Sequence, residues 1–585
     1  MYILGLNAFH GDSSACILKD GVLIAAAEEE RFLRIKHWAG FPEESIKWCL
    51  QEAGIELDDI NHIAINQNPK ANLIKKVLYT LSNRPSFQML FDRYKNKKKR
   101  SNIRTHISNA FLGAKLRGKI HAIEHHTAHL SSAFHVSPFD DAVIVSVDGF
   151  GDFASSAWGI GKGTNINLED KVYFPHSLGI FYQSLTQFLG FHNYGDEYKV
   201  MGLAPYGKPV FMDHMREIIK LKPDGKFELN LKYFRHHNEK IEYQWDSGSP
   251  RVGILFSNEL EKLLGSARLK DNEINQYHKN IAHSVQAMYE ESFFHLLNKL
   301  YSKHKIERIA IAGGCGFNSV ANGKITLKTP FKKVYVQSAS GDAGGALGAA
   351  LTTWYKFGGA KSKIKTEHHD HAYWGPSFTN EYIGKLLDKE KEKIKEENCE
   401  ISYVKDFSQL SNTIASKIKE GKIVGWFQGR MEWGPRALGN RSIICDPRRK
   451  DMKEILNLKI KRRESFRPFA PSIIIEEVSN WFEQTNEVPF MMQVFQILKE
   501  KRHLIPAVTH VDGSGRLQTV SNETNPRYYS LIKDFNKLTG IPMLLNTSFN
   551  ENEPVVCKPD QALETFLRTK MDVLVMGNWI ILRNL

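Results

Sequence analysis

The fold of this chain is decided by its first thirty residues, MYILGLNAFHGDSSACILKDGVLIAAAEEE. An apolar run from Tyr2 to Leu6 leads into a polar turn at residues 7–14. Two further apolar runs follow, Ala15 to Leu18 and Val22 to Ala27, with Lys19-Asp20-Gly21 between them. Short apolar runs separated by turn-forming residues predict three antiparallel strands.

The same layout recurs about 140 residues later. The apolar run Ala142 to Val147 leads into a turn at Asp148-Gly149-Phe150-Gly151-Asp152, and Ser155 to Gly161 returns. Two half-domains that each open with such a hairpin predict the duplicated architecture of actin-like and hexokinase-like ATP-binding proteins. In that architecture the two turns face each other across a cleft and hold phosphates through backbone N–H groups.

The length of 585 residues predicts two to four folding units. Hydrophobic residues at 42% and charged residues at 25% exclude a largely disordered, collagen-like or coiled-coil chain. Residues 357–372 are rich in Gly, Lys and His, and we interpret them as a linker between a domain at 1–356 and a second α/β domain at 373–585. We interpret the His-rich segment Glu367 to His371 as a solvated turn rather than a metal site.

No apolar run approaches the ~20 residues that a membrane span needs, and no leader precedes the first strand. We therefore expect a cytoplasmic protein with no membrane partner. The six cysteines include no C-x-x-C pair, so we expect buried or inert thiols in a reducing compartment. They are Cys16, Cys49, Cys315, Cys399, Cys445 and Cys557.

One stretch dominates the net charge of +14: the segment from Arg93 to Lys119 holds ten Lys and Arg residues and no acid. Such a block can bind nucleic acid or another polyanion. It carries few aromatic residues for base stacking. A solvated surface helix or insertion is our preferred interpretation.

The most specific local motif in the sequence is the group of histidines in Glu124-His125-His126-Thr127-Ala128-His129. His125 and His129 are spaced i, i+4, so on a helix both imidazoles project from one face, as two ligands of one metal require. Satisfied core histidines are the alternative. Asp148 and Asp342 are candidates to complete an N/O ligand set, which suits non-haem iron, zinc or manganese.

Two glycine-rich turns are candidates for a nucleotide contact. Gly313-Gly314-Cys315-Gly316 follows a predicted strand at Arg308 to Ala312, and Gly341 to Ala346 opens a predicted helix. Glycines permit close backbone approach to phosphates. Tight packing of a helix explains both turns about as well, so the alternatives stay open.

The second domain holds many arginines embedded among Gly, Pro and aromatic residues. Guanidinium groups match phosphate and carboxylate oxygens bidentately, so we favour an anion-binding cleft over a solvated basic face. A triphosphate together with a second phosphorylated substrate would need this many donors. The candidate residues are Arg430, Arg436, Arg463, Arg467, Arg516, Asn546 and Ser548.

Taken together, these motifs make the chain resemble the NodU/CmcH/TobZ-type O-carbamoyltransferases. The resemblance runs from Gly5 to Gly577. It rests on Ala27 to Phe32 with Lys36-His37, the His125/His129 pair, Val147-Asp148-Gly149, Glu197 to Gly207, Ala312-Gly313-Gly314 with Asn318, Gly434 to Ser442, Phe466 to Pro471, His510 to Gly513 and Asn546 to Asn550. Cys315-Gly316-Phe317 departs from the Val-Ala-Leu that is more usual at that turn.

The resemblance implies an N-terminal ASKHA-type (actin/hexokinase-like) domain of duplicated halves and a C-terminal YrdC-like α/β domain. The YrdC-like domain would convert carbamoyl phosphate and ATP, with Mg, to carbamoyladenylate. The N-terminal domain would transfer the carbamoyl group to a hydroxyl of a small-molecule acceptor, with AMP as the leaving group. Adenylation makes chemical sense, since carbamate is a poor electrophile and the mixed anhydride has a good leaving group.

The family's site residues carry over onto this sequence. The metal ligands, usually described with iron, fall on His125, His129, Asp148 and Asp342. Lys36 resembles a carbamoyladenylate contact, to which we add Gly313, Gly314 and Asn318. Arg430, Arg463, Arg516 and Asn546 resemble the nucleotide and phosphate site of the second domain, to which we add Arg436, Arg467 and Ser548.

His10 and Asp12, in the first turn, are our two candidates for the base that takes the acceptor's proton. Shaping the turn or binding phosphate is the alternative role for both. A threonylcarbamoyl enzyme acting on tRNA and a non-enzymatic nucleotide switch are the competing functions, and a nucleic-acid partner is not expected. The acceptor is left open, as is the oligomeric state, with a homodimer among the alternatives.

Overall fold

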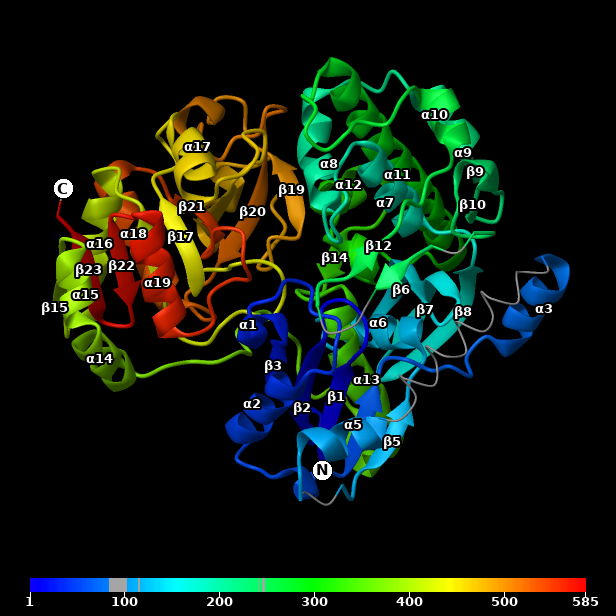
Figure 1. Ribbon diagram of the computed structural model, residues 1–585, viewed down its shortest axis with the longest axis horizontal. Coiled ribbons are helices and arrows are strands. Elements are labelled where there is room, and N and C mark those ends of the chain that lie inside the picture. The colour runs from blue at the N-terminus through cyan, green and yellow to red at the C-terminus, as the bar shows by residue number, and fades with distance from the viewer. Residues whose placement is uncertain (84–102, 114–115, 240, 245–247, 585) are drawn as a thin grey trace. The chain divides into compact units, whose positions relative to one another are not determined.

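The computed structural model describes residues 1–83, 103–113, 116–239, 241–244 and 248–584, and the chain forms two compact α/β units (Figure 1). Unit 1 comprises Met1–Asn318 and Ile325–His369, and unit 2 comprises Ser319–Lys324 and Asp370–Leu585. The change of unit at Asp370 falls within residues 357–372, the segment interpreted above as a linker.

The first sheet of unit 1 has the strand order β3-β2-β1-β4-β5. Strands β1, β2 and β3 form the antiparallel meander predicted from the first thirty residues, and β4 and β5 run parallel to β1. The strands are β1 (Tyr2–Asn7), β2 (Ser14–Lys19), β3 (Val22–Glu28), β4 (His62–Ile65) and β5 (Lys119–Ala122).

The second sheet repeats this arrangement as β8-β7-β6-β13-β14. The pairs β6/β7 and β7/β8 are antiparallel, and β13 and β14 run parallel to β6. The strands are β6 (Asp141–Gly151), β7 (Ala154–Lys162), β8 (Asn165–Tyr173), β13 (Arg308–Ala312) and β14 (Lys333–Val336). Identical order and direction confirm the duplicated, actin/hexokinase-like architecture of this unit.

One local prediction was wrong. We expected a turn at residues 148–152, but β6 continues to Gly151, with a register shift between Val147 and Gly151. A bulged strand end re-aims its side chains, and it does so here at Asp148.

Each sheet is followed by a helix that begins directly after its fifth strand: α6 (His125–Phe134) follows β5, and α13 (Asp342–Phe357) follows β14. Helix α13 packs on β1 and β2 of the first sheet, whereas α6 packs on β6 and β13 of the second sheet. The two helices also pack on each other. This crossed arrangement brings residues from both halves of the unit to one place.

Other helices of unit 1 pack around its two sheets. These helices are α1 (Glu30–Leu33), α2 (Glu43–Ala53), α3 (Leu73–Asn83), α5 (Ile103–Ala110), α7 (Leu178–Phe188), α8 (Glu197–Leu203), α9 (Met212–Ile218), α10 (Asn258–Leu264), α11 (Gln276–His304) and α12 (Ser319–Lys328), whose first turn belongs to unit 2. Helix α11 is capped by the side chain of Asn275, which accepts hydrogen bonds from Tyr277 N and His278 N.

Unit 2 is built on one nine-stranded sheet of order β15-β23-β22-β16-β17-β21-β18-β20-β19. Strands β16, β17, β18 and β22 of this sheet are buried along their whole length, as expected for a sheet covered on both faces. The strands are β15 (Cys399–Tyr403), β16 (Val424–Phe427), β17 (Arg441–Cys445), β18 (Ala470–Ile474), β19 (Gln493–Gln496), β20 (Ser514–Val520), β21 (Met543–Ser548), β22 (Val573–Met576) and β23 (Trp579–Arg583).

Helices of unit 2 alternate with these strands, which confirms the predicted α/β class. They are α14 (Asn380–Lys389), α15 (Lys391–Glu396), α16 (Phe407–Lys419), α17 (Met452–Ile455), α18 (Pro526–Thr539) and α19 (Pro559–Thr569). Within the described ranges, no helix has both the length and the apolar composition to cross a membrane. All six cysteines are free, and five of them are buried.

Candidate functional site

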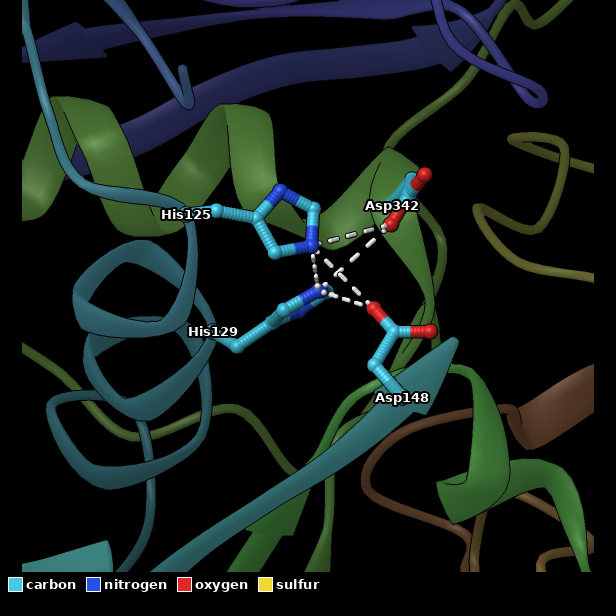
Figure 2. A group of neighbouring side chains, drawn as sticks. All are labelled: His125, His129, Asp148 and Asp342. Carbon is cyan, nitrogen blue, oxygen red and sulfur yellow. Dashed lines mark hydrogen bonds and ion pairs between the residues drawn. The ribbon is translucent and has the colours of Figure 1, made fainter. Parts of the chain in front are cut away.

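Four side chains from three elements of unit 1 converge on one point (Figure 2). His125 and His129 project from the same face of α6, as their i, i+4 spacing predicts, and Asp148 comes from the end of β6. Asp342 is the first residue of α13. One ligand atom from each of the four lies within 4.8 Å of those of the others.

The distances within this group are short and nearly equal. The two Nε2 atoms of His125 and His129 are 3.0 Å apart, and they lie 3.1 and 2.9 Å from Oδ2 of Asp148. Both Nε2 atoms lie 3.5 Å from Oδ1 of Asp342. Two imidazole nitrogens and two carboxylate oxygens directed at one point are a donor set that fits a divalent metal of the zinc, iron or manganese type.

The third histidine of the motif, His126, is not part of the four-residue group. His126 points away from the group and its Nδ1 contacts Ser146 Oγ at 2.9 Å, fully buried. Burial, together with the charge of His125, lowers the pKa of His126 to about 3. His126 is therefore a neutral core residue, and the alternative raised for the whole motif applies to this member alone.

Opposite charges hold the four side chains in place. Burial lowers the pKa of His125, but the carboxylates of Asp148 and Asp342 outweigh it and raise that pKa to about 10. Burial raises the pKa of Asp148, yet the two imidazoles hold it well below its usual range. A bound metal ion would take the place of the imidazole protons, because metal ligands must be deprotonated.

The first turn of α6 is fixed by two further acids. Asp152 Oδ2 accepts a hydrogen bond from the backbone N–H of His125 at 3.0 Å. Glu124 caps the helix by accepting from Thr127 N at 2.8 Å, and its other oxygen pairs with the buried Lys171 at 2.7 Å. These contacts orient the histidines from outside the group, as outer partners of metal ligands do.

His10 and Asp12, the two candidates for the base, have different neighbours in the structure. The ring centroid of His10 lies 6.0 Å from that of His125, beside the four-residue group. Asp12 is instead engaged with His37, whose Nδ1 lies 2.8 Å from Asp12 Oδ1. Burial lowers the pKa of His37, but Asp12 and Glu30 outweigh it and raise that pKa to about 9. Asp12 is thus held in an ion pair, whereas His10 lies beside the four-residue group.

Two further residues border this place: Tyr194, which we did not single out from the sequence, and Glu197, which opens one of the family motifs. A Cβ on Gly11 would lie 2.7 Å from Tyr194 Oη, so this tyrosine covers the first turn. Burial and the charges of Asp342 and Asp12 raise the pKa of Tyr194 well above its usual range. Burial also raises the pKa of Glu197 to about 7. Only its position three residues before the motif could have drawn attention to Tyr194.

Of the predicted carbamoyladenylate contacts, Gly313 and Gly314 lie beside the same place. Gly313 has φ +91°, and a Cβ there would meet Val147 O at 2.3 Å, while a Cβ on Gly314 would meet Asp148 Oδ1 at 2.9 Å. Asn318 exchanges hydrogen bonds with the side chain of Gln286 at 3.0 and 3.1 Å. Lys36 is exposed and precedes His37. The glycine turn thus permits a close approach to the metal-ligand group.

In unit 2 the structure gathers four of the predicted arginines. Burial, followed by the charges of Arg436, Arg463 and Arg467, lowers the pKa of Arg516 well below its usual range. Arg463 is oriented by Asn457 Oδ1 at 2.7 Å and by the ring of Phe469. The positive charge that these three arginines place around Arg516 is charge that a bound polyanion would compensate.

The remaining predicted residues of unit 2 are placed differently. Arg430 donates to the carbonyl oxygens of Trp374 and Gly375 at 2.8 and 3.3 Å. Asn546 is buried and donates to Ala437 O at 3.0 Å, next to Arg436 in sequence. Ser548 donates to Asn550 Oδ1 at 2.8 Å, and Lys461 binds both residues.

The loop with the sequence Gly-Pro-Arg-Ala-Leu-Gly, residues 434–439, is held by hydrogen bonds to neighbouring buried residues. Oε1 of the buried Glu432 accepts hydrogen bonds from the backbone N–H groups of Leu438, Asn440 and Arg441 at 2.7, 2.8 and 3.2 Å. Arg441 is itself fully buried and donates to four backbone carbonyls. Arg441 therefore supports this loop, whereas Arg436 on the same loop faces the arginine group.

Comparison with known proteins agrees with this arrangement. The Carbamoyltransferase N-terminus family matches residues 2–351 and the Carbamoyltransferase C-terminus family matches residues 415–583. The nodulation protein NolNO of Sinorhizobium fredii is 36% identical over 98% of this chain and 79% of its own length. An uncharacterized protein of Synechocystis, sll1178, is 38% identical over 99% of this chain and 96% of its own.

A 3'-hydroxymethylcephem-O-carbamoyltransferase of Streptomyces clavuligerus is 34% identical over 41% of this chain and 42% of its own length. Among solved structures, component A of the Acidaminococcus fermentans (R)-2-hydroxyglutaryl-CoA dehydratase is 14% identical, over 61% of this chain and 98% of its own, with a TM-score of 0.33. That value is too low to add to the topology described above. The two family matches together span most of the sequence, and the chain belongs to the carbamoyltransferase family of enzymes, which includes named O-carbamoyltransferases.

Proposed function

We propose that this chain is an ATP-dependent O-carbamoyltransferase with one half-reaction in each domain. The domain at 373–585 forms carbamoyladenylate from carbamoyl phosphate and ATP, and the domain at 1–356 transfers the carbamoyl group to a hydroxyl of a small-molecule acceptor. The observation that carries the proposal is the group of four guanidiniums made by Arg516 with Arg436, Arg463 and Arg467, within the part of the chain that matches the carbamoyltransferase C-terminus family.

The arginine group suits the adenylation chemistry. Water releases phosphate from carbamoyl phosphate to leave carbamate, and a carbamate oxygen then attacks the α-phosphorus of ATP and displaces pyrophosphate. Both steps develop negative charge on phosphate oxygens, which preorganised guanidinium groups stabilise. Arg436, Arg463 and Arg467 supply that charge around Arg516, and Mg²⁺ accompanies ATP.

Transfer then takes place in the N-terminal domain. His10 takes the proton of the acceptor hydroxyl as its oxygen attacks the carbamoyl carbon, and AMP leaves with the electron pair of the broken bond. His125, His129, Asp148 and Asp342 would hold a divalent metal, iron or another, that supplies Lewis-acid polarisation when bound. Lys36 and the Gly313-Gly314 turn bind the adenylate. Asp12 positions His37 and so shapes the first turn.

The test is carbamoyl-phosphate-dependent exchange of pyrophosphate into ATP. Arg516→Ala should lower the exchange rate by about 10²–10³-fold, the usual loss for one donor to a developing anion. Arg449→Ala is the matched control, because Arg449 is a surface arginine of the same unit that pairs with Asp451. Exchange at the wild-type rate in Arg516→Ala would place adenylation elsewhere.

A further inference from the structure

Helix α3 is amphipathic, and its aliphatic face is the exposed one. Its five aliphatic side chains are 50–76% exposed, and they share one face of the helix. They are Leu73, Ile74, Val77, Leu78 and Leu81. No other nine-residue window of the described chain holds more than two exposed large hydrophobic residues. Apolar patches of this kind mark an interaction surface.

The opposite face attaches α3 to unit 1. The ring of Tyr79 packs edge-on against Phe174 and Phe153, at centroid distances of 5.0 and 5.8 Å, and its hydroxyl donates to His237 O at 3.1 Å. Lys75 lies over the ring of Tyr173 at 5.1 Å. The face that bears Tyr79 is therefore the docked face. Helix α3 lies at the rim of unit 1 (Figure 1), and its aliphatic side chains are exposed.

The start of the helix is held just as firmly. The side chain of Asn72 donates to Asp152 O at 2.8 Å, and the carboxylate of Asp152 accepts from Asn68 N at 2.8 Å. Since the same carboxylate accepts from the backbone of His125, α3 is tied to the first turn of α6. A helix anchored by these contacts keeps its aliphatic face exposed as a feature of the fold.

The charge of the sequence around α3 indicates what kind of partner binds its aliphatic face. Residues 67–119 contain fourteen Lys and Arg and one acid, a net charge of +13 within a chain whose total is +14. The rest of the chain is thus close to neutral. Among the described residues, Lys70 precedes the helix and Lys75 lies at the edge between its aliphatic and its docked face, and both are exposed. Two copies of so basic a segment repel each other, so a second copy of this chain is a poor occupant.

We propose that the aliphatic face of α3, with Lys70 and Lys75 beside it, binds the surface of an anionic lipid bilayer. Aliphatic residues inserted at the level of the head groups, with basic residues nearby, are what peripheral helices use to bind such membranes. This departs from the expectation of no membrane partner, which rested only on the lack of a spanning run. The inference does not rest on the proposed function.

The experiment is flotation of the full-length protein with vesicles. One set is phosphatidylcholine alone, and the other contains about one third phosphatidylglycerol. We expect the wild type to float with the anionic vesicles only, and to be released at high salt because screening weakens the attraction. Ile74→Ser/Leu81→Ser should bind at least about tenfold more weakly, since it removes apolar area from the contact.

Ile364→Ser is the matched control, because Ile364 is exposed to the same extent as Ile74 but lies on another part of unit 1. Both exchanges are at exposed positions, and circular dichroism checks that the variants fold. Wild-type protein that stays at the bottom of the gradient with anionic vesicles overturns the proposal. So does a double variant that floats like the wild type. A dimer in sedimentation equilibrium that the double variant dissociates would assign the face to a second copy instead.

Discussion

Gly348 on α13 meets the backbone of Ala128 on α6 so closely that a Cβ at Gly348 would lie 1.7 Å from the Ala128 carbonyl oxygen. Ala128 precedes the candidate ligand His129, and Gly348 lies less than two turns beyond the candidate ligand Asp342. This contact therefore sets the distance between the two helices that carry three of the four converging side chains.

We expect Gly348→Ala to weaken the site as well as the fold. The backbone of α6 would have to move away, at a cost above the 1–3 kcal/mol usual for overpacking. Thermal unfolding and elemental analysis of bound metal measure both effects. Gly54→Ala is the control: nothing lies within 4 Å of its Cβ position, so only about 1 kcal/mol is expected from its positive φ. Equal losses in the two variants would contradict the role given to the close approach.

Removal of one metal ligand should separate the half-reactions. His129→Ala should lose most of the bound metal and the carbamoylation of acceptor, yet still make pyrophosphate from ATP and carbamoyl phosphate, because the arginine group is untouched. Both assays and elemental analysis are run on one folded preparation. His368→Ala, at an exposed histidine, controls for the loss of an imidazole. Full carbamoylation by a metal-free His129→Ala would show that these histidines are not ligands.

His10→Asn should stop transfer without affecting adenylation or metal content. We expect a loss of at least 10²-fold in acceptor carbamoylation, the usual contribution of a general base. Asp12→Asn should be milder, since Asp12 acts through His37. A larger loss for Asp12→Asn than for His10→Asn would reverse the assignment.

Arg516→Met should be at least as stable as the wild type when no ligand is bound. In the wild type, Arg516 is half-buried, and the charges of Arg436, Arg463 and Arg467 disfavour its own charge. Methionine at this position removes that repulsion. Functional sites are commonly stabilised by removing such repulsion. The melting temperature without ligand should therefore stay the same or rise, while the increase on adding ATP is lost. A clear drop without ligand would show that Arg516 has a structural role instead.

The Asp12–His37 pair should make stability depend on pH. The pKa of His37 is raised from 6.5 to about 9, so its contribution is present in full below pH 6.5 and is lost as the pH rises through 9. The wild type should exceed His37→Asn in free energy of unfolding by on the order of 2 kcal/mol at pH 6, and by less at pH 9.5. Urea unfolding at both pH values measures this. A difference that grows with pH would contradict the ion pair.

Much of unit 1 could be predicted from the sequence because the relevant interactions are local. The strands of both hairpins follow from short apolar runs between turn residues, and the shared face of His125 and His129 follows from helical periodicity alone. The arginine-rich loop near Gly434 was likewise visible as a cluster in the sequence. Asp148 and Asp342 were candidates from the sequence, and the family resemblance implied the same two acids.

The tertiary structure decided what local patterns could not. It brought Asp148 and Asp342 to the histidines through the crossed packing of α6 and α13, and it turned His126 into the core. It also paired Asp12 with His37, and left the aliphatic face of α3 uncovered. Each of these outcomes depends on which residue from a distant part of the chain occupies the neighbouring space, and spacing along the sequence does not determine that.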